Sequence, residues 1–179
     1  MKNLRFTLKA WPVIAIATIG LCLATQVVAK LFGIDLPDQQ NVGQVKEIFL
    51  HAFDSARHFA NCAVTVLMVL AIMPVVEEIV FRWLLVMLPA RIVKRREAGR
   101  SPAGGRRPED YVFVFVSSAL FSAAHYVQQP FPDTAFVALF FFGLAQCWLY
   151  FKTDRLWCPM LNHALFNLTN TVLIFVVPA

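Results

Sequence analysis

The feature that most constrains this chain is a long apolar run from Phe59 to Ala90, whose only charged residues are Glu77, Glu78 and Arg82. As one helix this run would be about 48 Å long, against a bilayer hydrocarbon core of ~30 Å. The helix must therefore tilt, protrude or bend, and Pro74 is the expected position of a kink. Two spans that turn at Pro74 are the alternative. We favour one kinked span, because two spans would export the basic segment that follows.

The three charges inside this run predict a functional site. A charged side chain at bilayer depth costs on the order of 2.5–3.5 kcal/mol on insertion scales. Glu78 and Arg82 are four residues apart and share one helix face, so they can form an ion pair. Glu77 lies about 100° round the helix and is left for another role. A purely structural network that locks two helices together is the alternative.

The composition indicates an integral membrane protein. Of its 179 residues, 59% are hydrophobic and 15% charged, and the mean hydropathy is +0.63, whereas soluble domains carry roughly 25% charged residues. The net charge of +5 comes from basic residues at the predicted membrane edges, which indicates membrane topology rather than nucleic-acid binding. The four cysteines show no CxxC spacing, so the sequence predicts neither a disulfide framework nor a thiolate metal site.

The apolar segments predict an all-α, polytopic membrane helix bundle of about five spans, in which the kinked long helix carries the Glu-Glu motif. The predicted spans are residues 12–29, 59–90, 111–132, 134–151 and 156–178, with Pro159 in the first turn of the last one. We divide this single domain into an N-terminal span with a polar surface segment (1–58) and a core (59–179). Residues 45–56 have helical apolar spacing, which predicts a short amphipathic helix on the membrane surface or an ordinary solvated helix.

The loop charges predict one orientation. Residues 91–110 form a basic, Gly- and Pro-containing segment that is expected to be a flexible cytoplasmic loop. The N-terminus and the turn at Lys152–Arg155 then also lie inside, and the more acidic segment 30–58 lies outside. We expect a multi-pass protein of the bacterial inner membrane.

Further polar residues occur in the third and fifth spans. His125 lies in the third, and His163, Asn167 and Asn170 form one polar stripe on the fifth. Together with the glutamates they supply a base, imidazoles and amide donors, the groups needed for water-mediated hydrolysis. Counted from the inner edge, however, His163 lies only about 7–10 Å deep and His125 about 21 Å deep, so the helices must tilt to bring them together.

These residues resemble three ordered motifs of the CAAX-protease and bacteriocin-processing family (Abi, CPBP) of glutamate-type intramembrane endopeptidases. The motifs are Glu77-Glu78-x-x-x-Arg82, Phe121-x-x-x-His125 and His163-x-x-x-Asn167. The resemblance implies that Glu77 and His125 activate a water, that His163 and Asn167 stabilise the oxyanion, and that Glu78 with Arg82 holds the architecture. Family members commonly have Gly where this chain has Trp83, a change that would narrow the substrate groove.

The resemblance also bears on cofactors and partners. It favours metal-free catalysis, so no cofactor is expected, whereas zinc held by Glu77, His125 and His163 is the alternative. The predicted partners are membrane lipid and a peptide or protein substrate at the membrane: a prenylated C-terminus, a leader peptide or a C-terminal sorting signal. A non-proteolytic immunity or scaffold protein and a small ion-coupled carrier are the other function classes, since Glu and His in spans also serve as relays.

Overall fold

The computed structural model describes residues 1–36, 40–97, 108–126 and 134–176, and every regular element in these ranges is helical. The α-helices follow one another along the chain, and two π-helical segments, η1 and η2, lie within the long helix. The elements are α1 (Lys2–Leu31), α2 (Gln40–Leu50), α3 (Ala56–Leu67), η1 (Met68–Ile72), α4 (Met73–Glu78), η2 (Ile79–Met87), α5 (Leu88–Glu97), α6 (Pro108–Ala124), α7 (Phe136–Thr153) and α8 (Trp157–Val176).

The predicted all-α membrane fold is confirmed. Among the described residues, three helical stretches are long and apolar enough to cross a membrane, namely α1, the continuous stretch Ala56–Ile92, and α7. Two of the five predicted spans differ from these. The apolar part of α6 is shorter, Asp110–Ala124, and α8 has 20 residues but carries the polar stripe of the fifth span.

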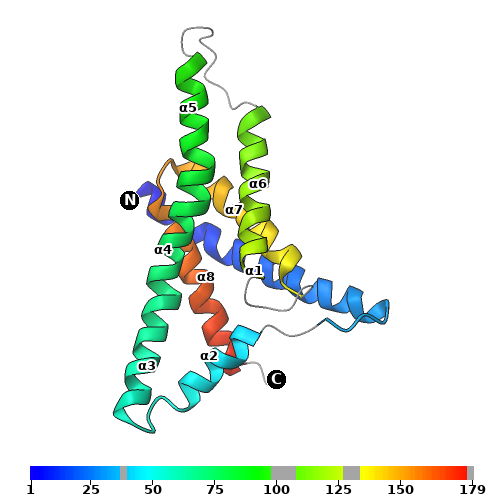
Figure 1. Ribbon diagram of the computed structural model, residues 1–179, viewed down its shortest axis with the longest axis vertical. Coiled ribbons are helices and arrows are strands. Elements are labelled where there is room, and N and C mark those ends of the chain that lie inside the picture. Colours follow the sequence, from blue (N-terminus) through cyan, green and yellow to red (C-terminus); the bar gives the residue numbers. More distant parts are fainter. Residues whose placement is uncertain (37–39, 98–107, 127–133, 177–179) are drawn as a thin grey trace.

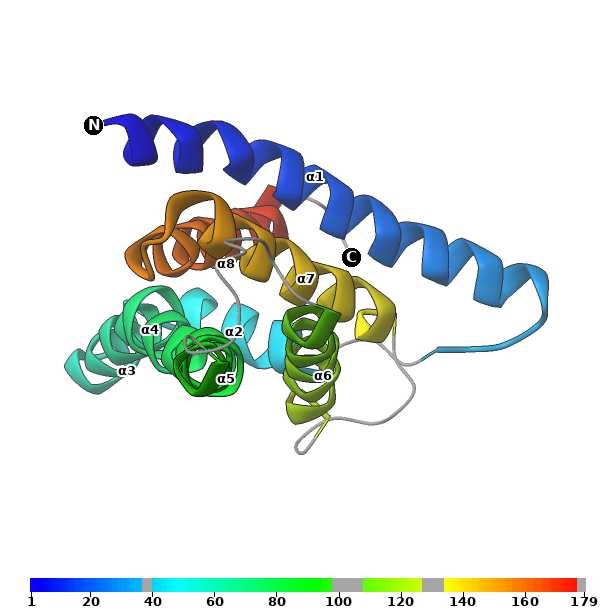
Figure 2. The ribbon, with the colours of Figure 1, turned by 90° about the horizontal axis from the view of Figure 1, so that it is seen from above.

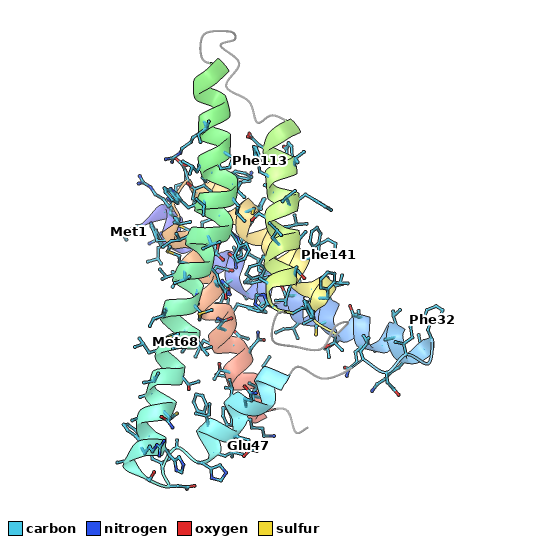
Figure 3. All side chains as sticks on the ribbon, in the orientation of Figure 1. Met1, Phe32, Glu47, Met68, Phe113 and Phe141 are labelled. Carbon is cyan, nitrogen blue, oxygen red and sulfur yellow. The ribbon has the colours of Figure 1, made fainter. Side chains whose placement is uncertain are left out.

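The long helix is continuous from α3 to α5 and stands as one column (Figure 1), which agrees with one span rather than two. The distortion expected at Pro74 takes the form of π-helical turns, because η1 lies immediately before α4 and η2 immediately after it. Proline lacks the backbone N–H and crowds the carbonyl one turn earlier, and a wider π turn accommodates both effects. Met68, the first residue of η1, lies on the lower half of this column (Figure 3).

The other helices pack against this column in layers. Viewed from above, α1 forms the outer layer, α7 and α8 lie beneath it, and the long helix and α6 lie on the far side (Figure 2). Helix α1 contacts both α7 and α8, so the N-terminal span shares the core of the predicted 59–179 segment. The buried core cluster comprises Ala10, Ile14, Ala15, Phe121, Phe142, Leu149, Cys158 and Phe166. The C-terminal end of α1 projects from the bundle, with Phe32 exposed at its tip (Figure 3).

Several predicted boundaries were wrong. The third span was predicted to reach Pro132, but α6 ends at Ala124, and His125 lies in the following turn. The basic segment was predicted to be loop from Arg91, but residues 91–97 continue α5, and residues 98–107 lie outside the described residues. The fifth span begins at Trp157 with Pro159 in its first turn, as predicted.

The helix in the polar segment between α1 and the long helix lies earlier in the chain than its apolar spacing indicated, since α2 begins at Gln40. Helix α2 ends at Leu50, whereas the spacing predicted helix over residues 45–56. The Ser55 hydroxyl oxygen accepts a hydrogen bond from the backbone N–H of His58 (3.2 Å) and so caps the start of α3. This cap competes with a continuous helix and separates α2 from α3. The Phe49 ring of α2 packs on Phe175 of α8, with ring centroids 5.4 Å apart.

Candidate active site

Glu78 and Arg82 form a buried ion pair where α4 passes into η2. Glu78 Oε2 lies 3.1 Å from Arg82 Nε, and the two side chains are 0% and 1% exposed. The Arg82 guanidinium also donates from Nη2 to the Gly143 carbonyl oxygen of α7 at 3.5 Å, and its carbon lies 4.5 Å from the centroid of the Phe121 ring of α6. Arg82 therefore joins the long helix to α6 and α7 in addition to balancing the charge of Glu78.

His163 of α8 lies against both glutamates. Its Nδ1 is 3.0 Å from Glu78 Oε1, and its Nε2 is 3.5 Å from Glu77 Oε2. Glu78 is thus contacted at both carboxylate oxygens, by Arg82 and by His163. Glu77 has the longer contact, and its side chain keeps 17% exposure. The two adjacent carboxylates therefore have different environments, one enclosed by partners and one partly open.

His125 approaches the same region from the turn after α6. Its Nδ1 donates a hydrogen bond to the Phe121 carbonyl oxygen at 2.8 Å, which leaves Nε2 unprotonated in the neutral ring. The fully buried Phe121 ring contacts both imidazoles, with centroids 4.8 Å from that of His125 and 5.8 Å from that of His163. Helix α6 with its following turn, and α8, therefore place the two histidines around one phenylalanine.

The mismatch in depth between the two histidines has a topological explanation. Figure 1 shows α5 and the start of α6 extending beyond the turn that joins α7 to α8. The start of α6 therefore lies farther along the long axis of the molecule than the start of α8. His125, in the turn after α6, and His163, in the second turn of α8, consequently both reach the Phe121 ring.

Asn167 makes a contact that the sequence did not indicate. Its Nδ2 donates to the Val69 carbonyl oxygen in η1 at 2.8 Å. The Asn167 amide, one turn after His163 on α8, therefore uses an N–H donor to bind the long helix. The predicted oxyanion role of Asn167 stays a prediction, and its observed contact ties α8 to the π-helical segment before the glutamates.

Sequence reasoning missed several polar residues around this cluster. Ser117 of α6 donates a hydrogen bond to the Phe81 carbonyl oxygen in η2. Gln146 of α7 and Asn162 of α8 are fully buried, and Gln146 Nε2 donates to Asn162 Oδ1 at 3.3 Å. The sequence did contain one signal, since Gln146 is the most strongly polar residue of the predicted fourth span.

Two further expectations concern metal ligands and the groove. Among the described residues, no three His, Cys, Asp or Glu side chains are arranged to hold a metal ion, so Glu77, His125 and His163 do not fit a three-ligand zinc site in this geometry. Trp83 is 41% exposed. Its side chain is therefore not enclosed in the cluster, and the narrowing of the groove stays a prediction.

Fold and site together define a polytopic α-helical membrane protein with a charged cluster buried between its helices. The family model described as type II CAAX prenyl endopeptidase Rce1-like matches residues 59–169. The chain belongs to this family and is a CAAX protease-like hydrolase of the membrane, which confirms the resemblance seen in the sequence. The match includes all six candidate site residues. No curated protein and no solved structure matches the chain.

Proposed function

We propose that this protein is a glutamate-type intramembrane endopeptidase that hydrolyses a peptide bond of a membrane-held substrate. The observation that carries the proposal is the buried contact of His163 with both Glu77 and Glu78. Ionisable residues within a membrane span are expected to be functional, because their burial is otherwise costly. Family membership supports the same reaction class.

In the proposed mechanism Glu77 is the general base. It is the more open of the two carboxylates, so a water molecule can reach it. The water oxygen attacks the peptide carbonyl carbon while its proton passes to Glu77. The unprotonated Nε2 of His125 is the second acceptor available to orient that water. Collapse of the tetrahedral intermediate breaks the C–N bond, and the proton returns to the departing amine.

His163 is proposed to stabilise the oxyanion. Glu78 holds its Nδ1, which orients the ring as a carboxylate partner orients other functional histidines. In the doubly protonated ring, Nε2 donates toward the developing negative charge. A donor of this kind is worth roughly 2.7–4 kcal/mol. Arg82 supports the arrangement by holding the other oxygen of Glu78, and Asn167 supports it by anchoring η1.

The substrate proposed for the first test is a peptide with a prenylated C-terminal CAAX sequence, because the matching family is described as a CAAX prenyl endopeptidase family. Leader peptides and C-terminal sorting signals are the other candidates. The proposed site of action is the bacterial inner membrane, with the N-terminus in the cytoplasm.

The test compares wild-type protein with Glu77→Gln in liposomes, using an internally quenched farnesylated CAAX peptide. We expect Glu77→Gln to reduce turnover by ~10²-fold or more, since general-base catalysis typically contributes 10²–10⁴-fold. Glu47→Gln is the matched control, because Glu47 lies on α2 with a side chain 69% exposed.

Comparison of membrane-protein termini in cells carrying wild-type protein or Glu77→Gln extends the test to substrates other than the CAAX peptide. We expect termini that appear only with the wild-type protein. Unchanged peptide cleavage and unchanged termini in the Glu77→Gln variant would contradict the proposal and favour a binding role.

A further inference from the structure

Both π-helical segments of the long helix receive a hydrogen bond from a neighbouring helix. A π turn bonds over five residues instead of four, so the change from α to π disrupts the regular pairing of backbone groups. The Val69 carbonyl oxygen of η1 accepts from Asn167 of α8, and the Phe81 carbonyl oxygen of η2 accepts from Ser117 of α6. Glu77 and Glu78 lie between these two anchored segments.

The register of η2 decides where Arg82 lies relative to the neighbouring helices α6 and α7. Each residue turns an α-helix by about 100°, so removing one π bulge would rotate the following residues by a large angle. Arg82 lies within η2 and contacts Glu78, the Gly143 carbonyl oxygen and the Phe121 ring. The contact with Glu78 is available at ordinary helical spacing, whereas the contacts with Gly143 and Phe121 lie on two other helices and depend on the register of η2.

We propose that Ser117 is a positioning residue that holds η2 in its π-helical register and thereby places Arg82 against the Gly143 carbonyl oxygen and the Phe121 ring. Ser117 is 0% exposed, and its hydroxyl reaches the backbone of the long helix one residue before Arg82. The hydroxyl thus supplies the Phe81 carbonyl with a donor from outside the helix. The inference rests on the proposed function, since it concerns the same charged cluster.

Ser118 offers a matched control within the same helix. It is the same residue type and is 1% exposed. Its hydroxyl, however, donates to the Val114 carbonyl oxygen of its own helix at 2.8 Å. Replacing Ser118 by Ala therefore removes a buried hydroxyl from α6 without removing a contact to the long helix.

The test compares Ser117→Ala with Ser118→Ala by means of one pair of isotope labels. The dipeptide Phe-Arg occurs once in the chain, at Phe81-Arg82. Labelling Phe at its carbonyl carbon with ¹³C and Arg at nitrogen with ¹⁵N therefore isolates the Phe81 carbonyl signal in solid-state NMR of the protein in liposomes. We expect Ser117→Ala to move this signal and Ser118→Ala to leave it in place.

Activity provides the second readout. With the farnesylated CAAX peptide, we expect kcat of Ser117→Ala to fall by about 10²-fold, the effect of a displacement of about 1 Å at a site of chemistry. We expect KM to change little, because Ser117 is fully buried between helices, and Ser118→Ala to keep the wild-type kcat.

An unchanged Phe81 signal in Ser117→Ala would overturn the proposal, and so would a moved signal with wild-type kcat. If the wild-type protein cleaves nothing, the proposed function fails, and the carbonyl signal alone then decides whether Ser117 holds η2. The two failures are therefore distinguishable.

Discussion

Glu77 and Glu78 are adjacent in the chain, yet one is enclosed by partners and the other is partly open. Glu78 contacts Arg82 and His163, whereas Glu77 contacts His163 at 3.5 Å and keeps 17% exposure. Arg82 places a cation beside Glu78, and the His163 ring contacts both carboxylates. These contacts offset the cost of burying ionisable groups, which is several kcal/mol for an ion without a partner. Arg82 and His163 therefore matter for folding as well as for chemistry.

A histidine also lies beside two carboxylates at the exposed turn after α2, where solvent surrounds all three side chains. His51 Nδ1 lies 2.7 Å from Asp54 Oδ2, and Nε2 lies 3.5 Å from Glu47 Oε2. The hydrogen bond to Asp54 and then the charge of Asp54 raise the pKa of His51 above 6.5, and Glu47 adds to this effect. A raised pKa in the folded state means that the contribution to stability is fully present below pH 6.5 and is lost as the pH rises through the raised value.

We therefore expect amide protection from hydrogen exchange at residues 51–55 to be greater below pH 6.5 than in mildly alkaline buffer. Asp54→Asn should move the NMR titration midpoint of His51 back toward 6.5. The control is His58→Gln, because the His58 ring lies near His51, with centroids 6.4 Å apart, but supplies no carboxylate. A His51 midpoint that is the same with and without the Asp54 carboxylate would refute the assignment.

At the scale of elements, the helices were predictable but their internal distortions were not. Apolar length and loop charge located the helical segments, and Pro74 indicated a distortion in the long one. The two π-helical segments accept hydrogen bonds from Ser117 and Asn167 at backbone carbonyls. A backbone acceptor leaves no pattern in the sequence, so neither contact could be inferred from spacing. The end of α6 at Ala124 was missed for a similar reason, because residues 111–132 contain no charge to mark a boundary.

The spacing between α6 and α7 is set by a glycine that can be tested. A Cβ at Gly143 would lie 3.0 Å from Ser118 Cβ and 3.1 Å from Ser118 Cα. Because the nearest atoms include backbone, the two helices would have to move apart. We expect Gly143→Ala to destabilise the folded protein by about 1–3 kcal/mol, as overpacking typically does. It should also weaken the Arg82 contact with the Gly143 carbonyl oxygen.

Gly20→Ala is the matched control, because a Cβ at Gly20 of α1 would meet nothing within 4 Å. It should be neutral or stabilise the helix by up to about 1 kcal/mol, since alanine has the higher helix propensity. Denaturation of both variants in the same detergent measures the difference. Equal stability of Gly143→Ala and Gly20→Ala would show that α6 and α7 do not depend on this close approach.

At the scale of the whole molecule, the site depends on helices that do not begin at a common level. Depths counted from the sequence assume that all predicted spans begin at the same membrane level, and the two histidines were therefore predicted to lie at different depths. In the structure α5 and α6 extend beyond the turn between α7 and α8 (Figure 1), and both imidazoles contact Phe121. Tertiary packing decides this offset, because α6 packs on α7 and on η2. The residues of the site could be chosen from the sequence, whereas their convergence could not be derived from it.

The proposed orientation of the whole protein gives the last prediction. The positive-inside rule places the basic N-terminus and the turn at Lys152–Arg155 in the cytoplasm, and the α2–α3 connection outside. Phe53 is 88% exposed in that connection, and Lys152 is exposed beside the α7–α8 turn. In a background with Cys22 and Cys62 replaced by alanine, an impermeant maleimide should label Phe53→Cys in intact spheroplasts. Lys152→Cys should be labelled only after permeabilisation, and the reverse pattern would mean that the protein is inserted in the opposite orientation.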